Sequence, residues 1–248
     1  MRRTRTAALW AMAMAATSGS EALAQAVQSP SVAVEAGTDQ RRRGLSWSDG
    51  AAAVEVSGFL PIGDSLDLSA AATTLRDSAR HGGADLGIDL AGRYHRDLGG
   101  WRLSGGVLGH LFVDRSELDY VELEGRASYL IGPAQIGVTA AYAPSQDAIG
   151  GDNLYLGADA WVALPGTPVS FNGGVGHSSG DTDNPVRAAR LRPGGSYWDY
   201  RLGAEYVMGE LVAGLRFSTT SGAGARGPSL YLDDNAGARL VGYVRLEL

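Results

Sequence analysis

The sequence has 248 residues with a formal net charge of −6 at pH 7, 44% apolar residues, 36 glycines and no cysteine. The lack of cysteine excludes disulfide bonds and thiolate metal sites, and the negative charge argues against a nucleic-acid partner. The apolar content is too high for a disordered chain. The fold therefore has to be stabilised without cross-links, for example by closure of a β-sheet.

The N-terminus has the order of a secretory signal peptide. Arginines among the first residues precede an apolar run over residues 7–16, and a small-x-small cleavage pattern ends at Ala24, with an alternative that ends at Ala26. This run is too short to cross a membrane as a helix, and no later stretch is long enough to do so. We expect residues 1–24 to be removed as a signal peptide and residues 25–248 to form a single exported domain.

The rest of the chain shows a two-residue alternation, which is clearest from Trp198 to Tyr206. Aromatic and aliphatic side chains occupy one face of this segment, and charged residues or glycine occupy the other, as in a β-strand between two different environments. The pattern predicts about twelve strands, each long enough to cross a bilayer when tilted. In chain order they cover residues 32–40, 52–60, 65–75, 84–95, 101–113, 119–130, 134–143, 153–164, 169–177, 197–207, 210–219 and 238–248.

The connections between these strands alternate between short turns, such as residues 208–209, and long polar loops, such as residues 178–196. This alternation is typical of outer-membrane barrels, whose periplasmic turns are short. An arginine at the lipid midplane would cost roughly 2–4 kcal/mol, so the uncharged strand faces are assigned to lipid. The sequence therefore predicts an all-β fold: a transmembrane antiparallel up-and-down β-barrel in the bacterial outer membrane, with both termini in the periplasm.

The charged strand faces are predicted to line the lumen. They could form a polar conduit, or they could form a plug of ion pairs that stabilises a closed barrel, and the sequence leaves both alternatives open. The candidate lumen-lining residues are Asp85, Asp89, Arg93, Arg102, Glu122, Glu124, Arg126, Asp159, Asp199, Arg201, Glu205 and Arg216.

Arg41, Arg42 and Arg43 follow the first predicted strand and are expected on an outer loop. There they could contact lipopolysaccharide phosphates, attract anions at a pore mouth, or simply keep the loop solvated.

Residues 176–180, Gly-His-Ser-Ser-Gly, match the serine-nucleophile pattern G-x-S-x-G, but a strand leads here into a polar loop and not into the helix that the motif requires. The four histidines lack the close spacing of a metal site. We therefore predict no catalytic residues, no cofactor and no metal site.

Three segments resemble the TorF-like porin family, small Gram-negative outer-membrane proteins also known as Gcw_chp. They are Arg-Gly-Leu-Ser at residues 43–46, Glu-Leu-Asp-Tyr-Val-Glu-Leu at residues 117–123 and Trp-Asp-Tyr-Arg-Leu-Gly at residues 198–203. The chain departs from the family in the Trp-Ser pair at residues 47–48, and it ends in Leu248 where outer-membrane barrels typically end in phenylalanine. The resemblance implies a signal peptide, a barrel and a porin-like role, but no particular substrate and no catalytic residues.

The leading prediction is a porin-like protein that allows passive diffusion of small hydrophilic solutes through a charged lumen. A non-conducting structural or adhesion barrel is the alternative, and a lipid-modifying barrel enzyme is a distant third. Widely separated interior charges would favour the channel, a continuous network of ion pairs the structural barrel, and an outward-facing Ser-His pair the enzyme. The expected partners are outer-membrane lipid and lipopolysaccharide, the barrel assembly machinery and small hydrophilic solutes.

Overall fold

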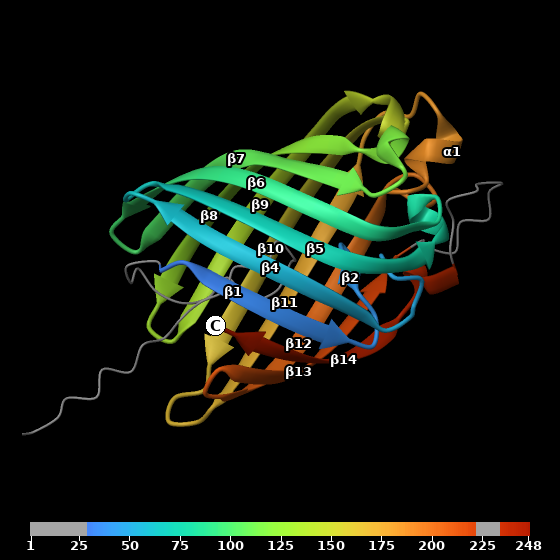
Figure 1. Ribbon diagram of the computed structural model, residues 1–248. Coiled ribbons are helices and arrows are strands. Elements are labelled where there is room, and N and C mark those ends of the chain that lie inside the picture. Colours follow the sequence, from blue (N-terminus) through green and yellow to red (C-terminus); the bar gives the residue numbers. More distant parts are fainter. Residues whose placement is uncertain (1–28, 222–233) are drawn as a thin grey trace, which may run out of the picture.

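The computed structural model describes residues 29–221 and 234–248, in which the strands of the main sheet form one closed antiparallel barrel (Figure 1). The predicted signal peptide lies outside the described residues. The barrel strands are β1 (Ser31–Gly37), β4 (Ala53–Ile62), β5 (Leu66–Ser78), β6 (Ala84–Leu98), β7 (Trp101–Phe112), β8 (Tyr120–Ile131), β9 (Ala134–Gln146), β10 (Gly151–Ala163), β11 (Val169–Ser179), β12 (Tyr197–Met208), β13 (Leu211–Thr220) and β14 (Arg239–Glu247). The prediction of an all-β barrel with about twelve strands is confirmed.

Each barrel strand pairs with its neighbours along the chain, and β1 closes the sheet by pairing with β14. The two-residue alternation in the sequence corresponds to the two faces of the barrel wall. Leu202, for example, is 65% exposed on the outside, whereas Glu205 is buried on the inside. Closure pairs the backbone of both edge strands, as a lipid environment requires. Within the described residues, no helix is both long and apolar enough to cross a membrane.

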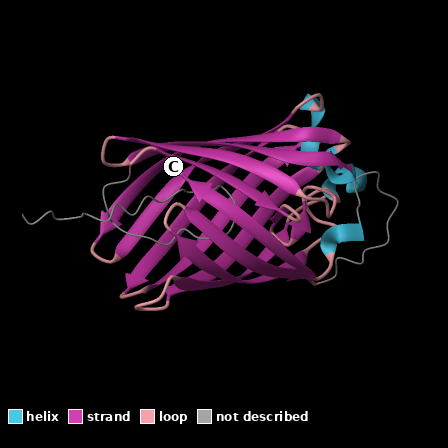
Figure 2. Cartoon of the chain, turned by 60° about the horizontal axis from the view of Figure 1, so that its bottom comes forward, coloured by secondary structure: helices cyan, strands magenta, loops and turns pink. Residues whose placement is uncertain are grey.

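The two ends of the barrel differ (Figure 2). The short turns, the beginning of β1 and the end of β14 all lie at the same end of the barrel, called here the short-turn end. These turns use residues with positive φ, such as Gly99 at +63° and Gly209 at +66°, because tight hairpin turns need the left-handed region that glycine adopts without strain.

The opposite, long-loop end carries the helical segments. These are η1 (Ala79–His81), η2 (Ser116–Leu118), η3 (Asp147–Ile149), α1 (Pro185–Ala188) and η4 (Asp234–Ala236). The loops pack on one another and on a hydrophobic cluster inside the barrel mouth. We call this hydrophobic cluster the loop cap. It consists of Trp47, Leu75, Ala84, Phe112, Leu118, Tyr120, Ala143, Ala148, Ile149 and Leu191.

Candidate functional site

The connection from β1 to β4 turns inward and enters the barrel, and its residues 39–48 are called here the inner segment. It contains a small hairpin of β2 (Arg41–Arg42) and β3 (Leu45–Ser46). The buried carboxylate of Asp39 organises the hairpin by accepting hydrogen bonds from the hydroxyls of Ser46 at 2.7 Å and Ser48 at 3.1 Å. Gly44, at φ +77°, passes so close to the wall that a Cβ atom would lie 2.5 Å from Thr220 Cγ2. Local polar contacts and close packing therefore hold the segment inside.

The arginines of the inner segment lie inside the barrel mouth, not on an exposed outer loop. Arg41 pairs with Asp39 at 3.0 Å and donates to the backbone carbonyls of Asn235 and Gly237 at 2.7 and 2.9 Å. The side chains of Arg41 and Arg42 are 2% and 9% exposed. This placement differs from the expected solvated loop.

Arg42 and Arg43 connect the inner segment to carboxylates on the barrel wall. Arg42 pairs with Asp89 on β6 and lies 3.5 Å from Glu55 on β4. Arg43 forms a bidentate pair with Glu122 on β8, in which the Nη1 to Oε1 distance is 2.9 Å. With the segment inside, each of these three carboxylates has a cationic partner in the barrel mouth, and this pairing favours the inward course of the segment.

A histidine links two of these carboxylates. His110 on β7 places Nδ1 2.7 Å from Asp89 Oδ1, and its Nε2 lies 3.9 Å from Glu122 Oε2. The ring of Tyr120 stacks on the imidazole with a centroid distance of 4.3 Å. Neighbouring strands β6, β7 and β8 thus present one continuous polar cluster to the inner segment.

The loop cap is tied together by buried arginines that the sequence pattern does not reveal. Arg190 donates to the carbonyls of Arg80, Leu118 and Ala148 at 3.1, 3.1 and 2.6 Å. Arg80 donates to the carbonyl of Ser46 at 3.0 Å, which joins the cap to the inner segment. Isolated loop arginines have no periodic signal, so sequence reasoning missed these two. Among the described residues, packed side chains of the loop cap fill the long-loop end of the lumen.

Toward the short-turn end, charged side chains form pairs along the wall. Arg93 lies 2.9 Å from Glu124, with side chains 15% and 20% exposed, and Arg126 lies 2.8 Å from Asp159, with side chains 17% and 22% exposed. This partial exposure on the inner face leaves free space beside the pairs, which water can occupy. This part of the lumen is lined by ion pairs and is less tightly packed than the mouth.

Four more candidate lumen residues occupy three further positions. Arg201 lies 3.5 Å from Asp199 on the same strand, β12. Arg102 pairs with Asp97 at 2.7 Å near the turn between β6 and β7, at the rim. Asp85 is exposed near the long-loop end of β6.

Glu205 and Arg216 belong to a cluster formed by β1, β12, β13 and β14. Glu205 accepts a hydrogen bond from the Tyr243 hydroxyl at 2.5 Å and lies 3.5 Å from Arg245. Glu35 lies 3.8 Å from Arg216 and 3.4 Å from Arg245. The sequence predicted Glu205 and Arg216 as lumen residues. It did not predict the hydrogen bond from Tyr243 to Glu205, because that bond forms only when the closed barrel brings β14 close to β12.

Residues 176–180 do not form a nucleophile elbow. Ser178 is buried on the inner face of β11, while His177 on the opposite face packs against Trp198 with a centroid distance of 4.6 Å. Within the described residues, no three metal-binding side chains gather into a candidate metal site.

Comparison with known proteins relates this geometry to outer-membrane porins. KdgM porin superposes with a TM-score of 0.58 and 6% identity over 87% of this chain and 98% of that chain. NanC porin gives a TM-score of 0.55 and 10% identity over 87% of this chain and 97% of that chain. A search of curated proteins finds no match to the sequence.

At such low identity these structures establish the fold alone, which is that of a porin-like outer-membrane barrel. A family model described as a bacterial protein of unknown function, Gcw_chp, matches residues 21–237. This match confirms the resemblance that the three sequence segments indicated. The chain belongs to the Gcw_chp family.

Proposed function

We propose that the protein is an outer-membrane porin through which small hydrophilic solutes diffuse when the inner segment leaves the lumen. The observation that carries the proposal is the division of the lumen into a less tightly packed, ion-paired part and a mouth closed by a short segment. Arg42 and Arg43 of that segment contact the wall through side-chain ion pairs, which can open without breaking the barrel ladder. The porin-like fold supports this function.

In the proposed orientation, the short turns and both termini lie in the periplasm and the long loops face outward, as in other outer-membrane barrels. The signal peptide is removed during export, and the barrel assembly machinery inserts the mature chain. The inner segment then closes the pore at its external mouth.

The charges of the inner segment predict the selectivity of the open pore. With Arg41, Arg42 and Arg43 displaced, the wall exposes Glu55, Asp89 and Glu122 without their cations. Carboxylates around a pore favour cations electrostatically. The open pore is expected to prefer cations, whereas the balanced pairs deeper in the lumen add little net charge.

A non-conducting structural barrel is the second candidate function. It is favoured by the loop cap, because Trp47 of the inner segment is buried in the hydrophobic cluster and Arg80 bonds to Ser46. These contacts oppose displacement of the segment. The two candidates therefore differ in whether the segment leaves the lumen at all.

Single-channel recording in planar bilayers separates these functions. We expect brief and infrequent openings from the wild type, and longer, cation-selective openings from the double variant Arg42→Gln/Arg43→Gln. Arg102→Gln serves as the control, because Arg102 pairs with Asp97 beside the turn between β6 and β7, at the opposite end of the barrel from the inner segment. The absence of conductance from folded wild type and from the folded double variant would establish the structural barrel instead.

A further inference from the structure

Long polar side chains in the part of the lumen toward the short-turn end lie along the barrel wall. Arg93 on β6 reaches across β7 to Glu124 on β8, where its Nη2 lies 2.9 Å from the carboxylate Oε2. Gly106 on β7 pairs with both residues in the strand register, so the arginine crosses a position that carries no side chain. A Cβ atom on Gly106 would lie 2.8 Å from Arg93 Cγ, and glycine therefore leaves the path along the wall clear.

The same arrangement recurs over the next strands. Arg126 on β8 reaches across β9 to Asp159 on β10 at 2.8 Å, and a Cβ atom on Gly137 of β9 would lie 2.5 Å from its Nη2. Arg201 on β12 lies over Gly174 of β11, whose Cβ atom would lie 2.8, 2.8 and 2.9 Å from Cζ, Nη2 and Nε. Three nearly equal distances mean that the guanidinium plane lies flat on the wall.

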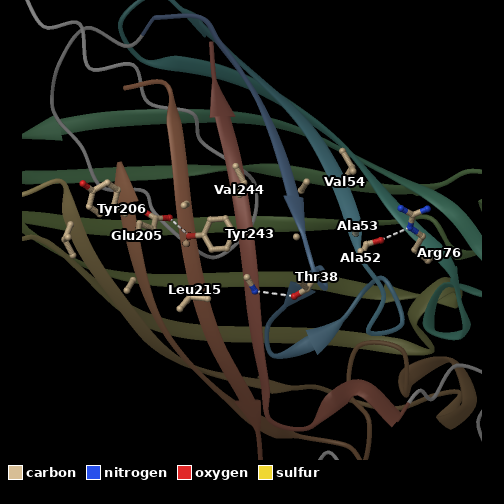
Figure 3. Close-up of a pocket in the computed structure, with 17 residues that line it drawn as sticks. Thr38, Ala52, Ala53, Val54, Arg76, Glu205, Tyr206, Leu215, Tyr243 and Val244 are labelled. Atoms are coloured by element: carbon tan, nitrogen blue, oxygen red, sulfur yellow. Dashed lines mark hydrogen bonds between the residues drawn. The ribbon is translucent and has the colours of Figure 1, made fainter. Parts of the chain in front are cut away.

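A further crossing of this kind joins β14 to β12. Tyr243 passes over Gly214 of β13 and donates its hydroxyl hydrogen bond to Glu205 at 2.5 Å (Figure 3). The register places these three residues in one line, and a Cβ atom on Gly214 would overlap the tyrosine ring. Because the long side chains follow the wall, these contacts line the lumen without crossing it.

Positive and negative groups alternate at short spacing on this wall. Three strands, β8, β12 and β14, carry opposite charges at successive inward positions, which are about 7 Å apart along a strand. These neighbours are Glu124 and Arg126, Asp199 and Arg201, and Arg245 and Glu247. Arginines and carboxylates occur in nearly equal number among the ion pairs of this part, so its net charge is small.

A wall of this kind suits a solute that carries both charges. An ion of one sign that binds a wall group displaces that group's partner and leaves a charge without compensation, which is costly in an enclosed space. A solute with an ammonium group and a carboxylate replaces both partners together, because its carboxylate accepts from guanidinium and its ammonium donates to a wall carboxylate. The pairs of Arg93 and Arg126 are partly exposed, so such a solute can reach them from the lumen.

We infer that this part of the lumen binds small zwitterions, such as amino acids, and favours their diffusion over that of organic ions of either sign. The inference rests on the proposed porin function and names the class of solute that it carries. The cation preference expected of the open mouth has a different origin, since Glu55, Asp89 and Glu122 lie at the opposite end of the lumen and act on inorganic ions.

Saturation-transfer NMR of the full mature chain in detergent micelles tests binding without any need for current. The probes are alanine, propionate, which lacks the ammonium group, and ethylammonium, which lacks the carboxylate. We expect alanine to bind at least about tenfold more tightly than either ion, because it makes charge-assisted contacts at both ends. Equal affinities for the three probes would overturn the inference.

Paired variants locate the binding. Arg126→Gln/Asp159→Asn removes one ion pair without leaving an unpaired charge, and it should weaken alanine binding at least about threefold while leaving the two ions unaffected. The matched control, Arg102→Gln/Asp97→Asn, removes a pair of the same kind at the rim and should bind alanine as the wild type does. Migration that changes on heating in a denaturing gel verifies that each variant is folded.

A glycine variant tests the geometry with every charge retained. Gly137→Ala should displace the Arg126 guanidinium from the wall and weaken alanine binding. Gly105→Ala is its control, because this residue faces outward on β7 and its Cβ atom would lie 3.6 Å from the nearest atom, an ordinary contact. Wild-type binding by both Gly137→Ala and the variant of the Arg126 pair would overturn the inference.

Bilayer recordings separate this inference from the porin function itself. Alanine should interrupt the current of Arg42→Gln/Arg43→Gln channels at lower concentrations than propionate or ethylammonium. Absence of current from this variant would contradict the proposed function, whereas the NMR preference for alanine would still support the binding site. Channels that conduct and are interrupted equally by all three solutes would overturn the zwitterion assignment alone.

Discussion

Glu122 is fully buried, and its carboxylate contacts Arg43 of the inner segment and the imidazole of His110. Removal of one member of such a pair leaves an uncompensated buried charge, which is more harmful than removal of both. The sequence predicted that this residue lines the lumen and left open whether its charge faces a conduit or belongs to a plug of ion pairs. The structure gives it a contact that holds the closing segment in place.

A double-mutant cycle measures this contact. Arg43→Gln should lower the free energy of unfolding by up to about 3–5 kcal/mol, because it leaves the Glu122 carboxylate buried without its cation. Glu122→Gln should also destabilise the protein, and the double variant should be more stable than the sum of the two losses predicts. Urea unfolding in detergent micelles gives the three values. Strictly additive losses would show that the two side chains do not interact.

His81 in η1 is buried between Trp47 and Phe112, whose ring centroids lie 4.5 and 4.7 Å from its own. Burial, with the positive charges of Arg190, Arg80 and Arg42 nearby, lowers the pKa of His81 well below its ordinary value of 6.5. The imidazole is therefore neutral in the closed loop cap.

This lowered pKa predicts that acid loosens the loop cap. The unfolded chain binds a proton at His81 below about pH 6.5 and the folded chain does not, so this stabilisation is complete above that pH and declines as the pH falls. Hydrogen exchange at the amides of Gly82 and Gly83, which bond within this loop, should accelerate from about pH 7.5 to about pH 5 after correction for the intrinsic rate. His81→Phe should remove this dependence and the control His177→Phe should keep it; a pH-independent wild type would contradict the assignment.

At the scale of single elements, β12 shows how one strand serves two environments. Leu202 faces outward, and the next residue, Gly203, faces inward across from Asn172 of β11. A Cβ atom on Gly203 would lie 2.6 Å from the Asn172 amide oxygen, so glycine leaves the space that the asparagine side chain uses. Strand phase, and not hydrophobicity alone, determines which substitutions the wall tolerates.

Paired arginine substitutions test this phase. Leu202→Arg should cost roughly 2–4 kcal/mol if the position is near the bilayer midplane, because the charge enters lipid. Asn172→Arg places the same charge inside, beside a glycine that leaves room for it, and should cost much less. Unfolding of both variants in lipid vesicles compares the two costs. A larger loss for the inward variant would contradict the assigned faces.

At the scale of the whole molecule, closure between β1 and β14 makes the barrel one cooperative unit whose outside is apolar. We predict that export depends on residues 1–24, which lie outside the described residues. We predict a mature N-terminus at or near Gln25 and co-sedimentation with the outer membrane. Mass spectrometry of the purified N-terminus and membrane fractionation measure both. Recovery of an uncleaved or freely soluble protein would refute the prediction.

The sequence by itself determined the barrel, its strands and the direction of their faces, because the two-residue alternation is a local property of each strand. Trp198 to Tyr206 illustrates this, since its apolar side chains lie outside and its charged ones inside. The long loops were also identified, but not their course. A loop has no periodicity, so nothing in Arg41–Arg43 distinguishes a solvated loop from one that turns inward.

Only the tertiary structure placed those arginines, because their partners come from distant parts of the chain. Glu122, for example, is 79 residues from Arg43. The same holds for the loop cap, where Arg80 and Arg190 meet across 110 residues. Barrel closure brings such groups together, and the pairing of their charges then favours the inward course of the inner segment.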